Sequence, residues 1–191
     1  PYHSYDMVVA RTMLNLKQER TLNVSVFPGG VSHINGLVGI AFADYKDMLI
    51  AFSSWASVPI DYFVKAIGKS NFNYATASLL PIIDTKYNPL IIQRGVLLNC
   101  LTKYYANIFS KAFQYIPQTY EWSKNDNRLS NKILPKSWDY NTPFRNDYER
   151  RQALIEIDVL VALALGMTLK QLRAIYKLQF AIAQQYEIDT W

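Results

Sequence analysis

The amino-acid sequence predicts an α+β fold, with a small mixed N-terminal part of short strands and helices followed by a mostly α-helical C-terminal part. The first 85 residues hold strand-length apolar runs separated by turns that contain Gly and Pro. From residue 86 onwards, hydrophobic residues recur mainly at the three- and four-residue spacing of a helix. Half of the 191 residues are hydrophobic, which is enough for a sizeable core. We therefore expect residues 1–85 and 86–191 to form one compact unit. Because the chain opens at Pro1 without an initiator Met, we interpret it as a fragment of a longer protein.

Short hydrophobic runs in the N-terminal part have the properties of strands. In the clearest run, Leu22, Val24 and Val26 alternate with polar residues, which is typical of a half-buried strand. Three runs have strand length: 7–14, 21–27 and 36–42. The third also fits the start of a helix, because its apolar stretch is short. Residues 70–76 are polar and aromatic without a helical period, so we expect a loop or an irregular strand there.

Two helices are expected before residue 85, because each has a recognisable end signal. Asp44 is suited to cap the start of a helix at 44–52. A second helix is expected at 58–67, with Pro59 in its first turn and Gly68 just beyond its end.

In residues 86–191 we expect three helices, at 88–113, 144–165 and 168–180, with a last helical stretch that reaches Tyr186. Gly166 closes the second of them, and Thr168 with Gln171 forms a capping-box pattern at the start of the third. Residues 114–143 hold three prolines and form an extended connection. A connection of this length is usually functional or poorly ordered.

The positive charge is concentrated in the middle of the chain. There are 20 Lys and Arg against 15 Asp and Glu, a formal net charge of +5. Residues 86–151 hold 11 basic and 5 acidic side chains, so the whole excess lies there. A local basic excess attracts polyanions such as a nucleic-acid backbone, although moderate basicity also occurs for solubility alone. No apolar run approaches the roughly 20 residues of a membrane span, and we expect a cytoplasmic protein without a membrane partner.

The residues of several common active sites are missing. A single cysteine, Cys100, excludes an internal disulfide framework and a Cys-based zinc site. The two histidines, His3 and His33, are too few for a multi-histidine metal site, and a Ser-His-acid triad would depend on one of them. The sequence has no glycine-rich nucleotide loop and no Gly-x-Ser-x-Gly elbow. We therefore expect no catalytic residue, no metal and no cofactor in this chain.

Two short patterns come close to catalytic motifs. Residues 44–46, Asp-Tyr-Lys, match half of a nuclease motif, but no partnered Pro-Asp precedes them. Residues 141–144, Asn-Thr-Pro-Phe, approach the Asn-Pro-Pro-aromatic motif of amino-methyltransferases. Because the second residue is Thr and no cofactor strand with a glycine turn lies upstream, we interpret this segment as the start of a helix.

The helix expected at 144–165 carries two arginines near its start and two carboxylates in its otherwise mostly apolar middle. Glu156 and Asp158 are two residues apart and do not face each other, so they do not form a carboxylate dyad. We expect one to be solvated and the other to pair with Arg151 or Lys170. Arg150 and Arg151 would contact DNA or pair with nearby carboxylates. The expected core positions are Ala153, Leu154, Ile157, Leu160, Val161 and Ala164.

Three groups of residues together form a recognisable pattern. The first is Glu19-Arg20-Thr21-Leu22, followed by Val26-Phe27-Pro28 and His33. The second is Asp61-Tyr62-Phe63-Val64-Lys65, followed by Gly68, Asn71 and Leu80-Pro81. The third runs from Pro143-Phe144-Arg145 through Glu149-Arg150-Arg151 and Glu156-Ile157-Asp158 to Gly166-Met167-Thr168 and Tyr186-Glu187. Together they resemble the C-terminal target-recognition, or specificity, region of type II, type IIG-like, restriction–modification DNA adenine methyltransferases.

The resemblance implies a role in DNA recognition. In such enzymes an N-terminal domain binds S-adenosylmethionine and methylates adenine, and many members carry a nuclease domain as well. The C-terminal region recognises the target and holds the DNA against the catalytic domain. Because the chain resembles only that region, its implied partners are double-stranded DNA and an upstream methyltransferase domain. S-adenosylmethionine is implied for the parent enzyme alone.

The candidate DNA-binding residues fall into three groups. Lys and Ser suit phosphate oxygens, and Asn can read adenine edges. The candidates are Lys69, Ser70, Asn71 and Asn73 in a tight loop; Lys124, Arg128, Lys132 and Lys136, spaced by four in the connection; and Lys65, Arg145, Arg150 and Arg151. The connection would then follow a DNA backbone, or it is a solvated loop. Phe72 and Tyr74 would stack near an extruded base, or they face the core.

A rival hypothesis from another class is a protein–protein docking or dimerisation module. The terminal helices are so apolar that they need cover on nearly every side. That cover would come from this chain, from the methyltransferase domain or from a second copy. In this hypothesis the basic connection has no role in binding.

Overall fold

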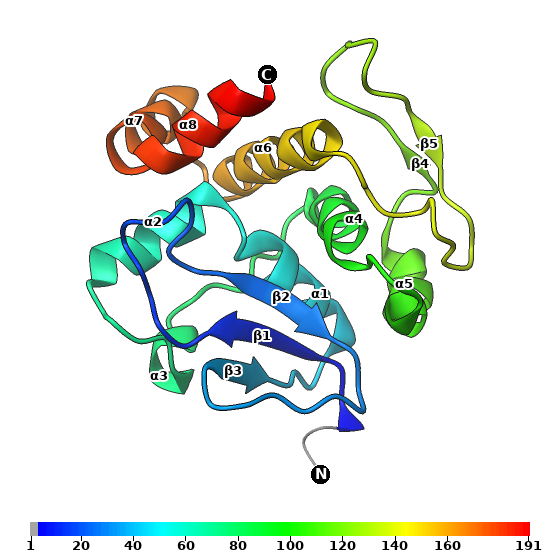
Figure 1. Cartoon of the computed structure of the whole chain (residues 1–191), viewed down its shortest axis with the longest axis horizontal. Coiled ribbons are helices and arrows are strands. Elements are labelled where there is room, and N and C mark those ends of the chain that lie inside the picture. Colours follow the sequence, from blue (N-terminus) through cyan, green and yellow to red (C-terminus); the bar gives the residue numbers. More distant parts are fainter. Residues whose placement is uncertain (1–3) are drawn as a thin grey trace.

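The computed structural model describes residues 4–191 and confirms the α+β class, with a small sheet and a C-terminal part that is mostly helical (Figure 1). Three antiparallel strands lie in the order β2–β1–β3: β1 Met7–Arg11, β2 Val24–Phe27 and β3 Leu37–Ile40. The first two strand predictions are thus confirmed with shorter bounds, and the third run is a strand. The central strand is buried from Met7 to Ala10, on both faces of the sheet.

Helix α2 (Val58–Ile67) has the predicted bounds, and α1 (Tyr45–Ser54) begins one residue and ends two residues later than predicted. The Asp44 carboxylate caps α1 by accepting the backbone N–H of Asp47 at 3.0 Å. Gly68 ends α2 with a φ of 70°, in the left-handed region that glycine adopts without steric cost.

The segment after α2 pairs with the chain that follows β1. The backbone N–H of Phe72 donates to the carbonyl oxygen of Thr12 at 2.6 Å, so this part is the expected irregular strand. The next four residues form a short helix instead, α3 (Tyr74–Ala77). It starts there because the Asn73 side chain accepts the Thr76 N–H at 2.9 Å.

The prediction of one helix over 88–113 is wrong, because the chain forms two helices, α4 (Asn88–Asn99) and α5 (Ala106–Ala112). Short 3-10 turns flank α5 at Lys103–Tyr105 and Phe113–Tyr115. No Gly or Pro marks the break in the sequence. Distant groups take the carbonyl oxygens at the end of α4: the Phe144 N–H bonds to Leu97, Arg150 to Leu98 and Trp138 to Cys100.

Residues 114–143 contain a two-stranded antiparallel pair, β4 (Thr119–Tyr120) and β5 (Lys132–Ile133). The rest is irregular, so the cations spaced by four do not line a helix face. The connection is anchored to the molecule by aromatic packing, since the rings of Tyr120 and Trp122 each lie 5.0 Å from the Phe144 ring.

The last three helices are α6 (Asp147–Ala164), α7 (Leu169–Gln179) and α8 (Ala181–Thr190). Helix α6 begins three residues later than expected, because Asn146 is its N-cap. The capping box predicted for α7 is complete, with both reciprocal hydrogen bonds between Thr168 and Gln171 present.

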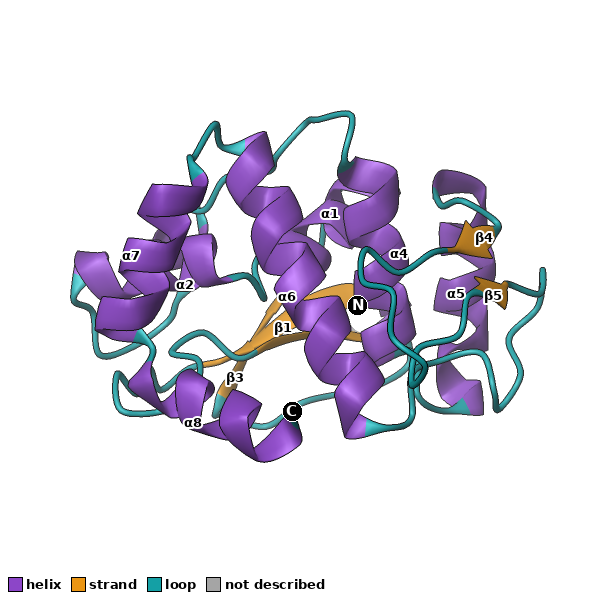
Figure 2. Ribbon diagram, turned by 90° about the horizontal axis from the view of Figure 1, so that it is seen from above, coloured by secondary structure: helices purple, strands orange, loops and turns teal. Residues whose placement is uncertain are grey.

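The main hydrophobic core draws on both halves of the chain. Helix α1 packs on β1 and β2, and α4 packs on α1 and α6 (Figures 1 and 2). One cluster of buried side chains extends from Val8 to Val161. Of the core positions expected in α6, Ala153, Ile157 and Val161 are buried, and Leu154, Leu160 and Ala164 pack against the cluster while partly exposed. A smaller cluster joins α2, α6, α7 and α8: Val58, Ala162, Leu172, Phe180 and Ala183.

Candidate nucleic-acid interface

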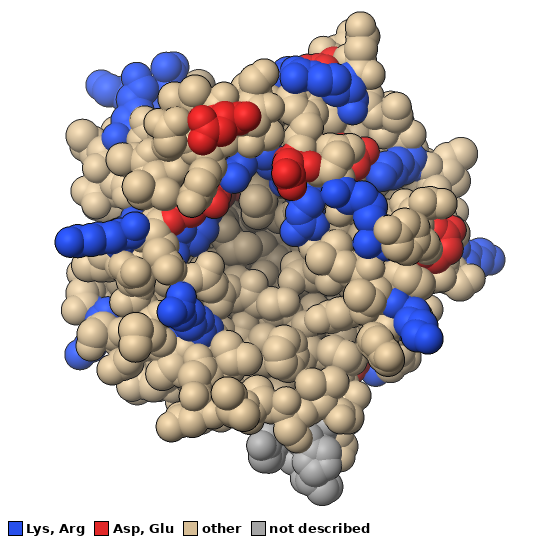
Figure 3. Space-filling model, in the orientation of Figure 1, with Lys and Arg blue, Asp and Glu red and all other residues tan. Residues whose placement is uncertain are grey.

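One face of the molecule is hollowed at its centre, and Lys and Arg side chains surround the hollow together with a few carboxylates (Figure 3). The hollow consists of two adjacent cavities of about 300 Å³ and about 480 Å³, which share Glu19, Arg150 and Leu154. Its walls come from the chain before β2 and from α1, α4, α6 and α8. It is therefore a concave surface built by elements from both halves of the chain.

Among the described cations that line this hollow, Arg150 is the one that forms no ion pair with a carboxylate. Its Nη1 donates to the carbonyl oxygens of Leu98 at 3.1 Å and of Phe144 at 3.3 Å. Within residues 4–191, no hydrogen bond or ion pair engages its Nε or Nη2. Burial lowers the pKa of Arg150 and the Asp147 carboxylate opposes this shift, yet a guanidinium stays charged at neutral pH. Arg150 thus supplies a fixed positive charge with donors to spare.

Arg151, the neighbouring candidate, is engaged within the chain. Its Nη1 makes a short ion pair with the Glu19 carboxylate, and its side chain is 14% exposed. The sequence predicts that Arg151 contacts DNA or pairs with a carboxylate near the start of α6, such as Asp147 or Glu149. The observed partner lies 132 residues away, so Arg151 joins the segment before β2 to α6.

Arg20 lies where the three segments that carry the family resemblance come together: the chain before β2, helix α2 and helix α6. Its Nη2 pairs with the Asp158 carboxylate at 3.0 Å, and Asp158 also accepts the backbone N–H of Val58 at 2.6 Å. Asp61, which is fully buried in α2, accepts the backbone N–H groups of Thr21 at 3.0 Å and Leu22 at 2.6 Å. This buried group of charges fixes the segment before β2 against α2 and α6.

The prediction that one of Glu156 and Asp158 is solvated and the other pairs with Arg151 or Lys170 is wrong. Both side chains are buried, and both are paired with other arginines. Asp158 pairs with Arg20, and Glu156 pairs with Arg94 at 2.7 Å. Sequence reasoning missed both arginines. A signal for Arg94 exists, since it is the single charged residue in the apolar run 88–101, and such a charge is almost always paired when buried.

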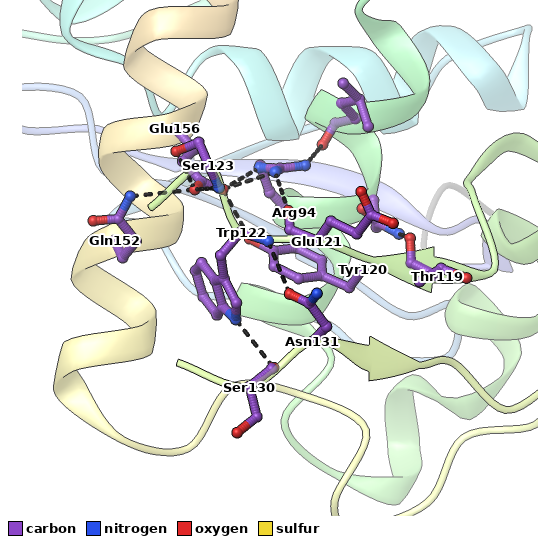
Figure 4. Close-up of polar contacts among 12 residues, drawn as sticks. Arg94, Thr119, Tyr120, Glu121, Trp122, Ser123, Ser130, Asn131, Gln152 and Glu156 are labelled. Carbon is purple, nitrogen blue, oxygen red and sulfur yellow. Dashed lines mark hydrogen bonds and ion pairs between the residues drawn. The ribbon is translucent and has the colours of Figure 1, made fainter. Parts of the chain in front are cut away.

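Glu156 is the centre of a polar network that ties the connection to α4 and α6 (Figure 4). Its Oε1 accepts from the Ser123 N–H at 2.8 Å, the Ser123 hydroxyl at 2.6 Å and Gln152 at 3.2 Å. Its Oε2 accepts from Arg94 at 2.7 Å and from the Tyr120 hydroxyl at 3.1 Å. Burial acts to raise the pKa of Glu156, but the Arg94 charge and the Ser123 donors outweigh it and hold this pKa below its usual range.

The loop of residues 69–73 lies at the left of Figure 1, next to the end of α2, whereas β4 and β5 lie at the right. Lys69, Ser70 and Asn71 are exposed. The Asn73 side chain is occupied as the N-cap of α3. Phe72 is fully buried, so the alternative in which it stacks on an extruded base is wrong; Tyr74 is 67% exposed.

Two cations of the connection, Lys124 and Arg128, share one carboxylate partner. Arg128 and Lys124 pair with the Asp126 carboxylate at 2.8 Å and 3.2 Å, and both also donate to the Tyr148 hydroxyl. Hydrogen bonds from Arg128 and Tyr148 hold the pKa of Asp126 well below its usual range. In this structure the side chains of Lys124 and Arg128 therefore make contacts within the loop, and a phosphate would have to compete with Asp126 for them.

Of the remaining candidates, some are engaged by groups of the described chain and two are not. Lys132 pairs with Glu149 at 3.4 Å. Lys65 donates to the Gln179 carbonyl oxygen at 2.7 Å and lies over the Phe180 ring. Arg145 donates to the carbonyl oxygens of Tyr140 and Leu101. In residues 4–191, Lys136 and Lys69 make no such contact.

The residues considered for other chemistry occupy ordinary structural places. His33 is partly exposed, and its Nδ1 lies 3.4 Å from the Ile34 carbonyl oxygen; His3 lies outside the described residues. Burial raises the pKa of the Cys100 thiol to about 12, which disfavours a thiolate at neutral pH. In segment 141–144, Phe144 is fully buried and the helix starts only at Asp147, which corrects the expected helix start.

Residues 4–191 contain no cluster of His, Cys, Asp and Glu placed to ligate a metal. Over the same residues, no helix is both long and apolar enough to cross a bilayer. Searches among protein-family models, curated proteins and solved structures found no match to this chain.

Proposed function

We propose that this chain is the DNA-binding target-recognition and clamping region of a restriction–modification, adenine-specific DNA methyltransferase, without a catalytic site of its own. The observation that carries the proposal is the central hollow with Arg150, whose Nε and Nη2 have no partner in residues 4–191. A charged, half-buried guanidinium with free donors suits a phosphate oxygen or a guanine edge.

The positions of the other candidates support a duplex lying across this face. The exposed loop with Lys69, Ser70 and Asn71 lies on one side of the molecule, and the connection that contains Lys136 lies on the other (Figure 1). Exposed Asn and Ser side chains suit base edges and phosphates, respectively. In this arrangement the loop reads the target, Arg150 anchors the backbone, and the connection limits movement of the duplex.

The proposal extends to the parent enzyme only through the resemblance. There, an upstream methyltransferase domain would bind S-adenosylmethionine and methylate the adenine, and a nuclease domain would be an optional addition. This chain would hold the DNA for that domain in the cytoplasm. Asp61 and Asp158 are buried, and Asp158 pairs with Arg20, so we assign these three charges of the quoted segments to the support of the recognition surface.

Duplex binding measured by fluorescence anisotropy across a salt series tests the proposal. We expect the parent chain to bind, with an affinity that falls steeply as salt rises, because counterions are released from the phosphates. Arg150→Gln should weaken binding about tenfold and reduce the salt slope by about 1. Arg11→Gln, an exposed cation at the end of β1, is the matched control and should change neither. Absence of duplex binding by the parent at low salt would contradict the proposal.

One observation favours the docking module as a second candidate. Val159 and Leu163 on the outer side of α6 are 40% and 50% exposed, and Leu169 at the start of α7 is 67% exposed. An apolar cavity of about 190 Å³ lies between these helices. If docking is the main function, the chain should self-associate in sedimentation experiments, Leu163→Glu should abolish this association, and duplex DNA should not bind.

A further inference from the structure

Helix α7 carries three cations and no acidic residue along its length. Its sequence, Leu169–Gln179, contains Lys170, Arg173 and Lys177. Residues spaced by three and four lie on one face of a helix. All three side chains are exposed, and with Leu169 and Ala174 they line one shallow surface of about 370 Å³. Figure 3 shows Lys and Arg side chains projecting at the upper left, where α7 lies in Figure 1. We call Lys170, Arg173 and Lys177 the α7 stripe.

The α7 stripe differs from the other basic segment because its charges are not compensated. Within the described residues, none of its three side chains takes part in an ion pair, a side-chain hydrogen bond or a cation–π contact. In the connection, by contrast, Lys124 and Arg128 share the Asp126 carboxylate, which offsets one of their two positive charges. A solvated helix face usually interleaves acidic and basic residues at four-residue spacing, which stabilises the helix. The α7 stripe lacks this arrangement and therefore presents three charges to an external anion.

Lys170, the first of these cations, lies at the helix end where a positive charge is electrostatically unfavourable. Lys170 lies in the first turn of α7, at the positive end of the helix dipole, and no acidic residue accompanies it. The helix start is already secured by the capping box between Thr168 and Gln171, so Lys170 has no capping task. Because Lys170 does not stabilise the helix and has no internal partner in residues 4–191, its positive charge is better suited to binding an external anion.

The dimensions of the α7 stripe fit a phosphate backbone. The helix rises 1.5 Å per residue, so Lys170 and Lys177 are about 10 Å apart along its axis. One DNA strand carries a phosphate about every 3.4 Å of duplex axis, so the stripe has the length of about three phosphates. Ala174 lies between the cations with a short side chain, which lets a backbone approach the helix closely.

We propose that the α7 stripe binds the phosphate backbone of the same DNA that the central hollow receives, independently of its sequence. This inference rests on the proposed function, and it assigns the main electrostatic clamp to α7 rather than to the basic connection. Arg and Lys contacts to phosphates position the protein on the duplex, while base contacts specify the target. The α7 stripe would therefore set affinity and salt dependence, and the loop of residues 69–73 would set the sequence preference.

A charge-matched pair of triple variants tests this inference by duplex binding across a salt series. The first variant is Lys170→Gln, Arg173→Gln and Lys177→Gln. The control is Lys17→Gln, Lys86→Gln and Lys103→Gln, which removes the same charge from three exposed positions on separate segments. We expect the first to reduce the salt slope by about 2 to 3, since each phosphate contact contributes about 0.9. The control should reduce it by less than 1. Thermal unfolding should be unchanged in both, because all six side chains are exposed.

The outcomes separate this inference from the function on which it rests. If the parent binds duplex DNA and the α7 variant keeps the parental slope, or if the control loses as much as the α7 variant, the α7 stripe is not the clamp, whereas the proposed function stands. If the parent binds anionic vesicles but no duplex at low salt, both proposals are wrong. Equal loss for two unrelated duplex sequences would support the sequence-independent role, and loss confined to one sequence would contradict it.

Discussion

Glu156 illustrates how much of this structure depends on single buried charges. Its side chain is 5% exposed and accepts hydrogen bonds from four residues on three segments of the chain. A buried ion pair adds little stability compared with a well-packed apolar pair, but removing one partner leaves the other charge buried and uncompensated. Arg94, 6% exposed, would be that uncompensated charge.

We therefore expect Glu156→Gln to lower the free energy of unfolding by about 3 kcal/mol at pH 7. The pKa of Glu156 is 4.5 when unperturbed and lower in the folded protein. Its stabilising contribution is therefore fully present above pH 4.5 and is lost as the pH falls through the folded pKa. Urea denaturation at pH 7 and pH 3 should show the difference between parent and variant shrinking at the lower pH.

Asp84→Asn is the control for this measurement, because Asp84 makes a long, exposed ion pair with Lys46 at 3.9 Å. Such pairs contribute about 0–1 kcal/mol, so the control should stay near the parent at both pH values. A Glu156→Gln variant as stable as the parent at pH 7 would show that Arg94 finds another partner or water.

At the residue scale, local chemistry was predictable and distant partners were not. Asp44, Gly68 and the Thr168–Gln171 box act within three or four residues, and the structure confirms each of them. For Arg151, the alternatives predicted were DNA or a carboxylate close to its own helix turn, but the partner in the structure is Glu19. No local rule identifies which of fifteen carboxylates folds onto a given arginine.

At the element scale, the sequence predicts where helices start better than where they are interrupted. Hydrophobic residues continue at helical spacing from α4 into α5, so periodicity alone predicts one helix. The break at Cys100 follows from groups that compete for the α4 carbonyl oxygens, among them the Phe144 N–H and the Trp138 indole. These groups belong to the connection and to the start of α6, whose positions depend on the whole fold.

The crossing of α1 and α4 depends on Gly95. A methyl group at this position would lie 2.0 Å from the Ser53 Oγ and 3.0 Å from the Ser53 Cα, so the two helices would have to separate. Alanine favours a helix by about 1 kcal/mol over glycine, but overpacking a core typically costs about 1–3 kcal/mol. We expect Gly95→Ala to destabilise the protein by about 2 kcal/mol in urea denaturation.

The double variant Gly95→Ala with Ser53→Gly checks the cause of this effect. Removing the Ser53 side chain gives the new methyl group space, so the double variant should lose less stability than the two single variants together. Strict additivity, or a Gly95→Ala variant more stable than the parent, would show that close packing at this crossing is not what limits stability.

At the scale of the whole molecule, the two compositional halves share one interior. Helix α1, from the first half, is buried from Met48 to Ser54, and α4, from the second half, packs against it. The hollow with Arg150 also depends on both halves, because its walls include α1 as well as α4 and α6. The change in composition near residue 85 predicted the arrangement of strands and helices along the chain, whereas shared burial is a property of the packed fold.

Residues 1–85 should therefore not fold when expressed alone. Without residues 86–191, the apolar face of α1 that contacts α4 would be exposed to water, and burial of this face is a main source of stabilisation for the small sheet. We expect far-ultraviolet circular dichroism of the 1–85 fragment to lack a cooperative thermal transition. The full chain should unfold in one transition, with coincident curves from circular dichroism and tryptophan fluorescence. A dispersed amide NMR spectrum with a cooperative melt for the fragment would instead establish residues 1–85 as an independent domain.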